Sequence, residues 1–288
     1  ERVKVIVVVD PRDKTHHALE RCRQLPTETD LDIQAVLYIE SASAEDFRSI
    51  YSKQSKWLKE QVQPFIDDGY KITTEVVPFQ KLYEAVIETA QKHKVDFIVK
   101  PMRQHSLFQS VVRTSTDWNL IRHCHFPLML VSDQGSNLGK PVLASVDVCS
   151  GDANHEALND IVVAQAKLLS GVLGSEVGLV NAWRAATPMM AVGSVDATPY
   201  PTPSDLQKEH REAALQLAEK HDLEKVQIHV EEGAPSYVVN HVANTVNAGL
   251  IVMGTVARKG ISGALIGNTA EGVLEGTDCD VLVVKLPV

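Results

Sequence analysis

Two kinds of sequence pattern alternate along this chain, and their order occurs twice. Short apolar runs of strand length are separated by longer stretches whose apolar residues recur at helical spacing. Because a crossover helix joins parallel strands, this alternation predicts a parallel sheet covered by helices on both faces. Strands are expected at residues 3–9, 33–39, 72–77, 95–99 and 128–131, and again at 142–146, 176–182, 226–230, 250–253 and 281–284. Helices are expected at residues 15–24, 45–66, 82–93, 115–123 and around 157–169.

The spacing between equivalent residues of the two halves indicates a duplication. The ends of the two first strands are 137 positions apart, and three later pairs are each 154 positions apart. We expect the 17-residue difference to be an insertion at residues 184–204, where four prolines interrupt regular structure. The pairs are Asp10 with Asp147, Lys100 with Gly254, Asp117 with Glu271, and Leu128 with Leu282.

Two domains of the α/β class are therefore expected, each with five parallel strands. Their predicted ranges are residues 1–134 and 139–288. The segment 133–139 between them is polar and contains two glycines, so it is expected to be a flexible joint.

Charge and composition exclude several classes of protein. The net charge of −9 is uneven, with −1 on residues 1–134 and −8 on the remainder. Such an acidic surface argues against general nucleic-acid binding, which needs basic patches. No apolar run approaches the roughly 20 residues of a membrane helix. The 4 scattered cysteines contain no CxxC pair, and no signal-peptide pattern precedes the first strand, so we expect reduced core thiols and a cytoplasmic location.

The last third of the chain contains the most informative motif. The apolar strand at 250–253 ends at Gly254, and a polar, glycine-containing loop leads to Gly267 and Asn268. Asn268 occupies the position of a helix N-cap, with Glu271 three residues later at capping-box spacing. A helix N-terminus favours an anion because of its free N–H groups and its dipole. The pattern is therefore typical of a phosphate site, although its spacing is neither that of Walker A nor that of GxGxxG.

The motif Gly254-x2-Ala257-x9-Gly267-Asn268 resembles the G-x2-G-x9-G-[ST] nucleotide loop of the universal stress protein family. A short helix and a Val-rich last strand follow it, as in that family. Ala257 stands in place of a glycine, and Asn268 stands in place of a serine or threonine. The resemblance covers essentially the whole chain and implies two tandem Rossmann-like (adenine nucleotide alpha hydrolase-like) domains. It also implies that the last strands of the two domains pair, so that one chain forms an intrachain pseudo-dimer.

The resemblance further implies ATP or another adenine nucleotide as the ligand of the second domain. An acidic residue at the first strand end faces the adenine and ribose in that family, and this role falls on Asp147 and less directly on Asp10. Open α/β sheets bind ligands at such strand ends, although an Asp there can also cap the next helix. Thr255, Arg258 and Thr269 are added from the sequence as polar neighbours of the motif. The candidate binding residues are Asp147, Gly254, Thr255, Arg258, Gly267, Asn268 and Thr269.

The equivalent loop of the first half carries basic residues in place of glycines. The side chains of Lys100, Arg103 and Arg113 would fill the space that a phosphate needs beside the backbone. We therefore expect the first-half site to be degenerate. The alternative is an anion pocket for a different ligand, built from these cations and His105.

The resemblance implies a role in stress response, and the patterns predict a protein that acts by binding a phosphate-bearing ligand and not by catalysis. The sequence contains no carboxylate pair with a placed base, no triad, no metal-ligand cluster and no complete P-loop. Three alternatives stay open: a weak nucleotide hydrolase, an interaction module with vestigial sites, and a protein that binds an apolar, anion-headed, lipid-like ligand under residues 184–204. Pairing of two tandem chains in a homodimer also stays open.

Overall fold

The computed structural model describes residues 2–27, 30–41, 43–102, 115–133, 135–185, 201–255 and 267–287. Ten strands and eight helices alternate along these ranges. None of these described helices is both long enough and apolar enough to cross a membrane. The strands are β1 (Val3–Val9), β2 (Leu31–Glu40), β3 (Lys71–Phe79), β4 (Phe97–Pro101), β5 (Leu128–Val131), β6 (Val142–Ser145), β7 (Val177–Trp183), β8 (Val226–Glu232), β9 (Leu250–Gly254) and β10 (Asp280–Val284). The helices are α1 (His17–Arg23), α2 (Ala44–Asp67), α3 (Leu82–His93), α4 (Ser115–His123), α5 (Ala153–Leu173), α6 (Pro203–Lys220), α7 (Pro235–Thr245) and α8 (Asn268–Gly276).

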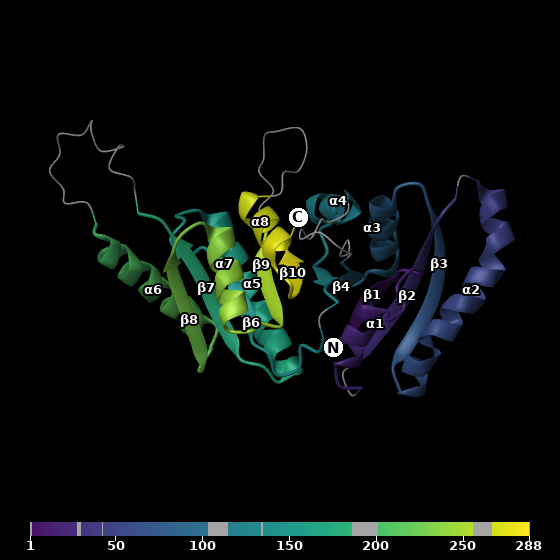
Figure 1. The fold of residues 1–288 in the computed structure, drawn as a ribbon, viewed down its shortest axis with the longest axis horizontal. Coiled ribbons are helices and arrows are strands. Elements are labelled where there is room, and N and C mark those ends of the chain that lie inside the picture. The colour runs from purple at the N-terminus through teal and green to yellow at the C-terminus, as the bar shows by residue number, and fades with distance from the viewer. Residues whose placement is uncertain are drawn as a thin grey trace.

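The ten described strands form one continuous sheet in the order β3-β2-β1-β4-β5-β10-β9-β6-β7-β8. Neighbouring strands within each half are parallel, whereas β5 and β10 pair antiparallel at the centre. The two halves lie side by side, with α2 and α6 near opposite ends of the molecule (Figure 1). The α/β class, the two tandem domains and the pairing of their last strands are confirmed.

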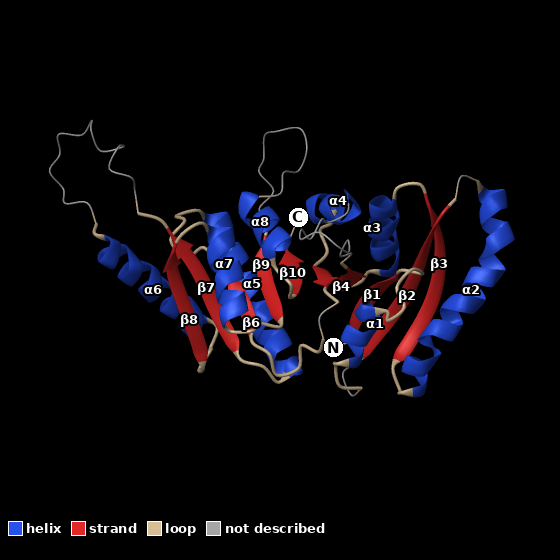
Figure 2. Ribbon diagram, in the orientation of Figure 1, coloured by secondary structure: helices blue, strands red, loops and turns tan. Residues whose placement is uncertain are grey.

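Helices cover both faces of the sheet (Figure 2), and the two faces are packed differently. On one face, α3, α4, α7 and α8 bury a single apolar cluster that includes residues of both halves. On the other face, α1 and α2 bury one cluster, and α5 and α6 bury a separate one. Phe97 and Met129 are partly buried and pack against both of these clusters. The core is therefore continuous across the join on one face and divided on the other.

The pairing register corrects the predicted spacing between the halves. Val5 pairs with Phe97 in the first half, and Val142, which is 137 positions after Val5, pairs with Leu250 in the second. Phe97 therefore corresponds to Leu250, which is 153 positions later, and the predicted spacing of 154 is wrong by one residue. A shift of one residue matters in a strand because it moves every side chain to the other face.

The join itself supports the corrected spacing. Met129 of β5 and Leu282 of β10, which are also 153 positions apart, pair with each other in the antiparallel ladder. A residue that pairs with its own counterpart marks the pseudo-twofold axis. With this register, Lys100 corresponds to Met253 and not to Gly254.

The extra residues of the second half do not form one insertion. The second strands give a spacing of 144 (Ile33 and Val177), which is seven more than the spacing of the first strands. The third strands give 154 (Ile72 and Val226), so ten further residues lie between β7 and β8. The first seven precede β7, in a segment where α5 has 21 residues and its counterpart α1 has 7. The prediction of a single insertion at 184–204 is therefore wrong.

One proline of the predicted insertion begins a helix. Pro203 occupies the first turn of α6, where its fixed φ and missing N–H are tolerated. Thr202 is the N-cap, and its side chain and that of Asp205 form a capping box. Residues 186–200 of the same segment lie outside the described residues.

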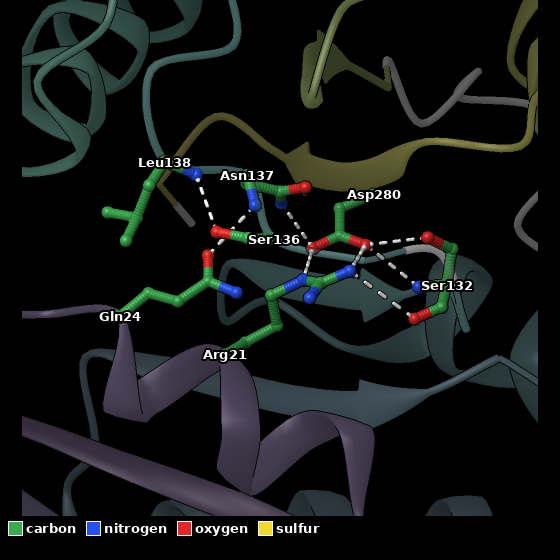
Figure 3. Close-up of polar contacts among 7 residues, drawn as sticks. All are labelled: Arg21, Gln24, Ser132, Ser136, Asn137, Leu138 and Asp280. Atoms are coloured by element: carbon green, nitrogen blue, oxygen red, sulfur yellow. Dashed lines mark hydrogen bonds and ion pairs between the residues drawn. The ribbon is translucent and has the colours of Figure 1, made fainter.

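A buried ion pair links the two halves beside the join (Figure 3). The side chain of Asp280, at the start of β10, is 1% exposed and accepts hydrogen bonds from Arg21 Nε and Nη2 at 2.6 and 3.2 Å. It also accepts bonds from the Ser132 N–H and hydroxyl at 2.8 and 3.0 Å and from Asn137 Nδ2 at 2.7 Å. Good geometry and additional hydrogen bonds are what a buried ion pair needs to offset desolvation. Because Arg21 belongs to the first half, these bonds fix its position against the second.

A second buried ion pair occupies positions that are apolar in the other half. Lys100 Nζ lies 2.7 Å from Asp117 Oδ1, and the two side chains are 7% and 0% exposed. At a spacing of 153, which the starts of α4 and α8 also show, the counterparts are Met253 and Ala270. Both of these residues belong to the apolar cluster that spans the halves. The cation of Lys100 is therefore used inside the fold.

Asp280→Ala removes the carboxylate that compensates the buried guanidinium of Arg21. We expect the free energy of unfolding, measured by urea denaturation, to fall by about 3–5 kcal/mol. The control is Lys56→Ala, which breaks the Lys56–Glu60 pair, whose side chains are 80% and 60% exposed. This change should cost less than about 1 kcal/mol. Equal, small losses for both variants would contradict a role for Asp280 in holding the halves together.

Lys100→Met and Asp117→Ala together install the residue types of the second half. Each single change removes one charge of a buried pair and should cost about 3–5 kcal/mol. The double variant should cost at least ~1 kcal/mol less than the sum of the single costs, because no unmatched charge is then buried. Urea denaturation of the four proteins in a double-mutant cycle measures this coupling. Additive costs would show that the two charges do not compensate each other.

Candidate ligand site

The predicted site lies at the carboxyl ends of β6 and β9, where the order of the strands reverses direction. Two cavities, of about 180 and 480 Å³, lie there. His155, Pro235, Gly254 and Thr269 line both cavities, so the two form one crevice. Of the predicted residues, Asp147 lines the smaller cavity, Thr255, Gly267 and Asn268 line the larger, and Gly254 and Thr269 line both. Arg258 lies outside the described residues.

The helix that begins at this crevice has no side-chain cap among the described residues. Gly267 is the N-cap of α8, with extended backbone angles (φ −68°, ψ 144°). Asn268 is the first residue of the helix, so its predicted role as N-cap and its capping box with Glu271 are wrong. The N–H of Glu271 bonds the Gly267 carbonyl at 3.1 Å instead. The start of α8 therefore presents backbone N–H groups and the positive end of the dipole to the larger cavity.

Thr255 lines the larger cavity and carries a buried hydroxyl. The residue is 8% exposed, and its Oγ1 has no hydrogen-bond partner in the part of the chain that the structure describes. Its N–H donates to the Val284 carbonyl at 3.0 Å, which holds the residue at the end of β9. Buried polar groups in proteins are nearly always hydrogen-bonded. Because Thr255 also lines the larger cavity, its hydroxyl is a candidate contact for a hydrogen-bonding ligand atom.

Asp147 is held by two side chains from the first turns of α5. The buried side chain of Asn159 accepts a bond from the Asp147 N–H at 3.0 Å and donates to its carbonyl at 2.8 Å. His155 Nδ1 lies 3.0 Å from Asp147 Oδ2, and the Asp147 side chain is still 54% exposed. The backbone is thus fixed while the carboxylate is free to contact a ligand.

The two ends of the crevice differ in charge. Cys149 is an exposed residue whose thiol is partly covered. This partial burial raises the pKa of the thiol, and nearby Glu209 and Asp147 raise it further, so the end near Asp147 is acidic. Arg184 lines the larger cavity and donates from Nε to the Gly233 carbonyl at 3.3 Å. An anionic group is therefore favoured at the α8 end. Cys149 also corrects the prediction that the cysteines are core thiols.

The two glycines of the motif differ in the space around their Cα atoms. A Cβ atom at Gly254 would overlap the side chain of Leu158 from α5. A Cβ atom at Gly267 would meet nothing within 4 Å among the described residues. Packing alone requires a glycine at Gly254, whereas Gly267 leaves open space beside the start of α8.

The residues of this crevice that sequence reasoning missed include His155, Asn159 and Arg184. Arg184 follows the carboxyl end of β7, so the strand-end argument used for Asp147 could have found it. His155 lies in the first turn of α5, at the same edge of the sheet. Asn159 could have been noticed as a polar residue among the apolar positions of that helix, but its contact with Asp147 depends on the loop conformation.

The first half lacks the equivalent arrangement in its described residues. Asp10 accepts bonds from the Arg12 N–H at 3.0 Å and from Arg12 Nε at 3.1 Å. The counterpart of Gly254 at the corrected spacing is Pro101, and Lys100 is paired with Asp117. Arg103, His105 and Arg113 lie outside the described residues, so the anion pocket stays a prediction. No three His, Cys, Asp or Glu side chains of the described ranges are grouped to hold a metal ion.

Comparisons with known proteins agree with the repeated fold. The model described as the universal stress protein family matches residues 2–132 and 142–285. Universal stress protein E of Escherichia coli (strain K12) is 32% identical over 294 residues, which cover 98% of this chain and 93% of that protein. The Salmonella typhi protein of the same name is 31% identical over the same shares. A crystal structure from Pseudomonas aeruginosa UCBPP-PA14, assigned to the universal stress proteins, has a TM-score of 0.79 at 26% identity and covers 98% of this chain and 92% of that one.

Gly254→Ala should destabilise the protein through packing. The added methyl group overlaps Leu158, and overpacking of this kind typically costs about 1–3 kcal/mol. Adding Leu158→Ala should recover part of the stability lost, relative to Leu158→Ala alone. Gly267→Ala is the matched control and should change the melting temperature little. A greater loss of stability from Gly267→Ala than from Gly254→Ala would contradict the packing role of Gly254.

Proposed function

Because this chain belongs to the universal stress protein family, we propose that its second half binds an adenine nucleotide, such as ATP, in the crevice between β6 and β9. The observation that carries this proposal is the buried hydroxyl of Thr255, which has no hydrogen-bond partner among the described residues. It lies beside the start of α8, which has no side-chain cap in the same ranges. Each feature favours a phosphate oxygen, as acceptor for the hydroxyl or as the anion at the helix dipole.

The charge distribution of the crevice supports one orientation of the nucleotide. The phosphates lie in the larger cavity, near the start of α8 and Arg184. The nucleoside lies in the smaller cavity, whose wall includes Val146, Val180 and Met253. Asp147 then accepts hydrogen bonds from the ribose, and its negative charge stays away from the phosphates.

The proposed activity is regulation by binding in a stress response. The crevice combines a fixed carboxylate, a hydroxyl and a helix start, which suffices to recognise a nucleotide. Ala257 and Asn268 replace the glycine and the hydroxyl of the family motif, so the second-half site is a reduced version of the family site. We propose the same residue ranges, 1–134 and 139–288, for the two domains and a cytoplasmic location.

Thr255→Val removes the buried hydroxyl and preserves the shape of the side chain. Loss of a hydrogen bond to a charged group costs about 1.5–3 kcal/mol, so ATP should bind about tenfold to a hundredfold more weakly. Isothermal titration of the purified chain with ATP measures the change. Thr245→Val is the matched control, because the Thr245 hydroxyl on α7 donates to the His241 carbonyl outside the crevice. Absence of ATP binding to the unchanged protein would overturn the proposal, and equal binding by the two variants would overturn the role of Thr255.

The same titration, followed for released phosphate, tests the alternative of a weak hydrolase. His155 lines both cavities and contacts Asp147, so it is the residue placed to activate a water molecule. Turnover that His155→Ala abolishes would favour hydrolysis, and binding without turnover favours regulation. The lipid-like alternative concerns a segment whose residues 186–200 lie outside the described ranges.

A further inference from the structure

Another cavity, of about 170 Å³, lies where the core is divided, between α1 and α5. Its wall includes Val3 and Leu31 at the amino ends of β1 and β2, and Leu250 at the amino end of β9. It is therefore at the opposite edge of the sheet from the nucleotide crevice.

The polar residues of this wall bond to one another. Arg21 and Asn137 both donate to the Asp280 carboxylate, at 2.6 and 2.7 Å for the shortest bonds. Gln24 Oε1 accepts a bond from the Asn137 N–H at 3.0 Å. The remaining wall residues are aliphatic, aromatic or sulfur-containing. A water molecule in a cavity needs two to four polar partners, so this wall does not favour water.

The unequal lengths of two equivalent helices explain the cavity. On this face of the sheet, α5 has 21 residues in the second half, and its counterpart α1 has only 7 in the first. The central strands are therefore less completely covered beside α1, and Phe97 and Met129 are left partly exposed at the join. Burial raises the pKa of the Cys22 thiol on the α1 side to about 12, as expected for an apolar wall.

We propose that this cavity between the halves binds a single short alkyl chain, either a free hydrocarbon or the tail of an amphiphile whose head stays in water. Apolar cavities of about 150 Å³ stay dry and bind small apolar molecules, and this one has a comparable volume. Leu168 lines the cavity and is 54% exposed, so it marks the mouth through which a chain enters. The head is not recognised, because the cation of Arg21 is already bonded to Asp280.

A chain bound there contacts both halves at once. Val5, Leu25 and Phe97 belong to the first half, and Leu169 and Leu173 belong to the second. Binding therefore stabilises the joined arrangement, and the melting temperature of the tandem protein should rise with the concentration of the apolar ligand. ATP should not compete, because its proposed crevice is at the other edge of the sheet.

The test is isothermal titration of the full chain with 1-octanol and, separately, with octanoate. We expect one binding site per chain for each ligand. The dissociation constants of octanol and octanoate should lie within about tenfold of each other, which corresponds to about 1.4 kcal/mol, and ATP should change neither of them. Val172→Phe places a ring in the cavity and should weaken the binding of octanol and of octanoate by about tenfold or more. Leu168→Asp puts a charge at the mouth and should weaken octanoate more than octanol, whereas Leu215→Asp, at another exposed leucine on α6, should change neither.

Three results would overturn the proposal. The first is the absence of saturable octanol binding. The second is that a Val172→Phe variant, shown to be folded by circular dichroism, binds octanol with the affinity of the unchanged protein. If that variant does not fold, the corresponding result is that Leu168→Asp binds octanoate with the affinity of the unchanged protein. The third is binding of octanoate without octanol, which would mean that a cationic group recognises the head. Failure of ATP binding with retention of octanol binding would leave this site intact and remove only the nucleotide proposal.

Discussion

The antiparallel pairing of β5 with β10 is the interaction on which the rest of the structure depends. It converts two five-stranded sheets into one sheet of ten described strands. Hydrogen bonds of the ladder fix the register, and the pairing of Met129 with Leu282 places the pseudo-twofold axis between them. The ladder brings the two edges together, so that the Arg21–Asp280 ion pair forms beside it.

The two faces of the joined sheet show what the duplication preserved and what it changed. On the α3/α4/α7/α8 face, helices of both halves bury one cluster. On the α1/α5 face, the short α1 leaves the core divided, and a polar network at Asp280 lies beside the gap. The symmetric face thus provides cohesion, and the asymmetric face provides a cavity.

Much of the fold could be predicted from the sequence because hydrophobic periodicity determines strands and helices locally. The strands at 3–9 and 128–131 and the helices at 82–93 and 115–123 agree with the structure at both ends. The spacing between the halves was wrong by one residue because matching similar residues, such as Leu128 with Leu282, cannot replace the ladder register. The sequence could bring most of the candidate residues to one crevice, because strand ends and helix starts meet at one edge of the sheet. The N-cap at Gly267 and the Asn159 contacts could not be predicted, because they depend on loop conformation.

The covalent link between the halves has a consequence for how such a protein changes over time. In a dimer of identical separate chains, every substitution alters both copies, so a site cannot be lost on one side and kept on the other. Here the segment between β5 and β6 keeps the partner domain at high effective concentration whatever the amount of protein in the cell. One copy can therefore acquire a buried charge pair such as Lys100–Asp117 where the other keeps Met253 and Ala270. Both halves of one chain can therefore keep the same fold while only one of them keeps a binding function.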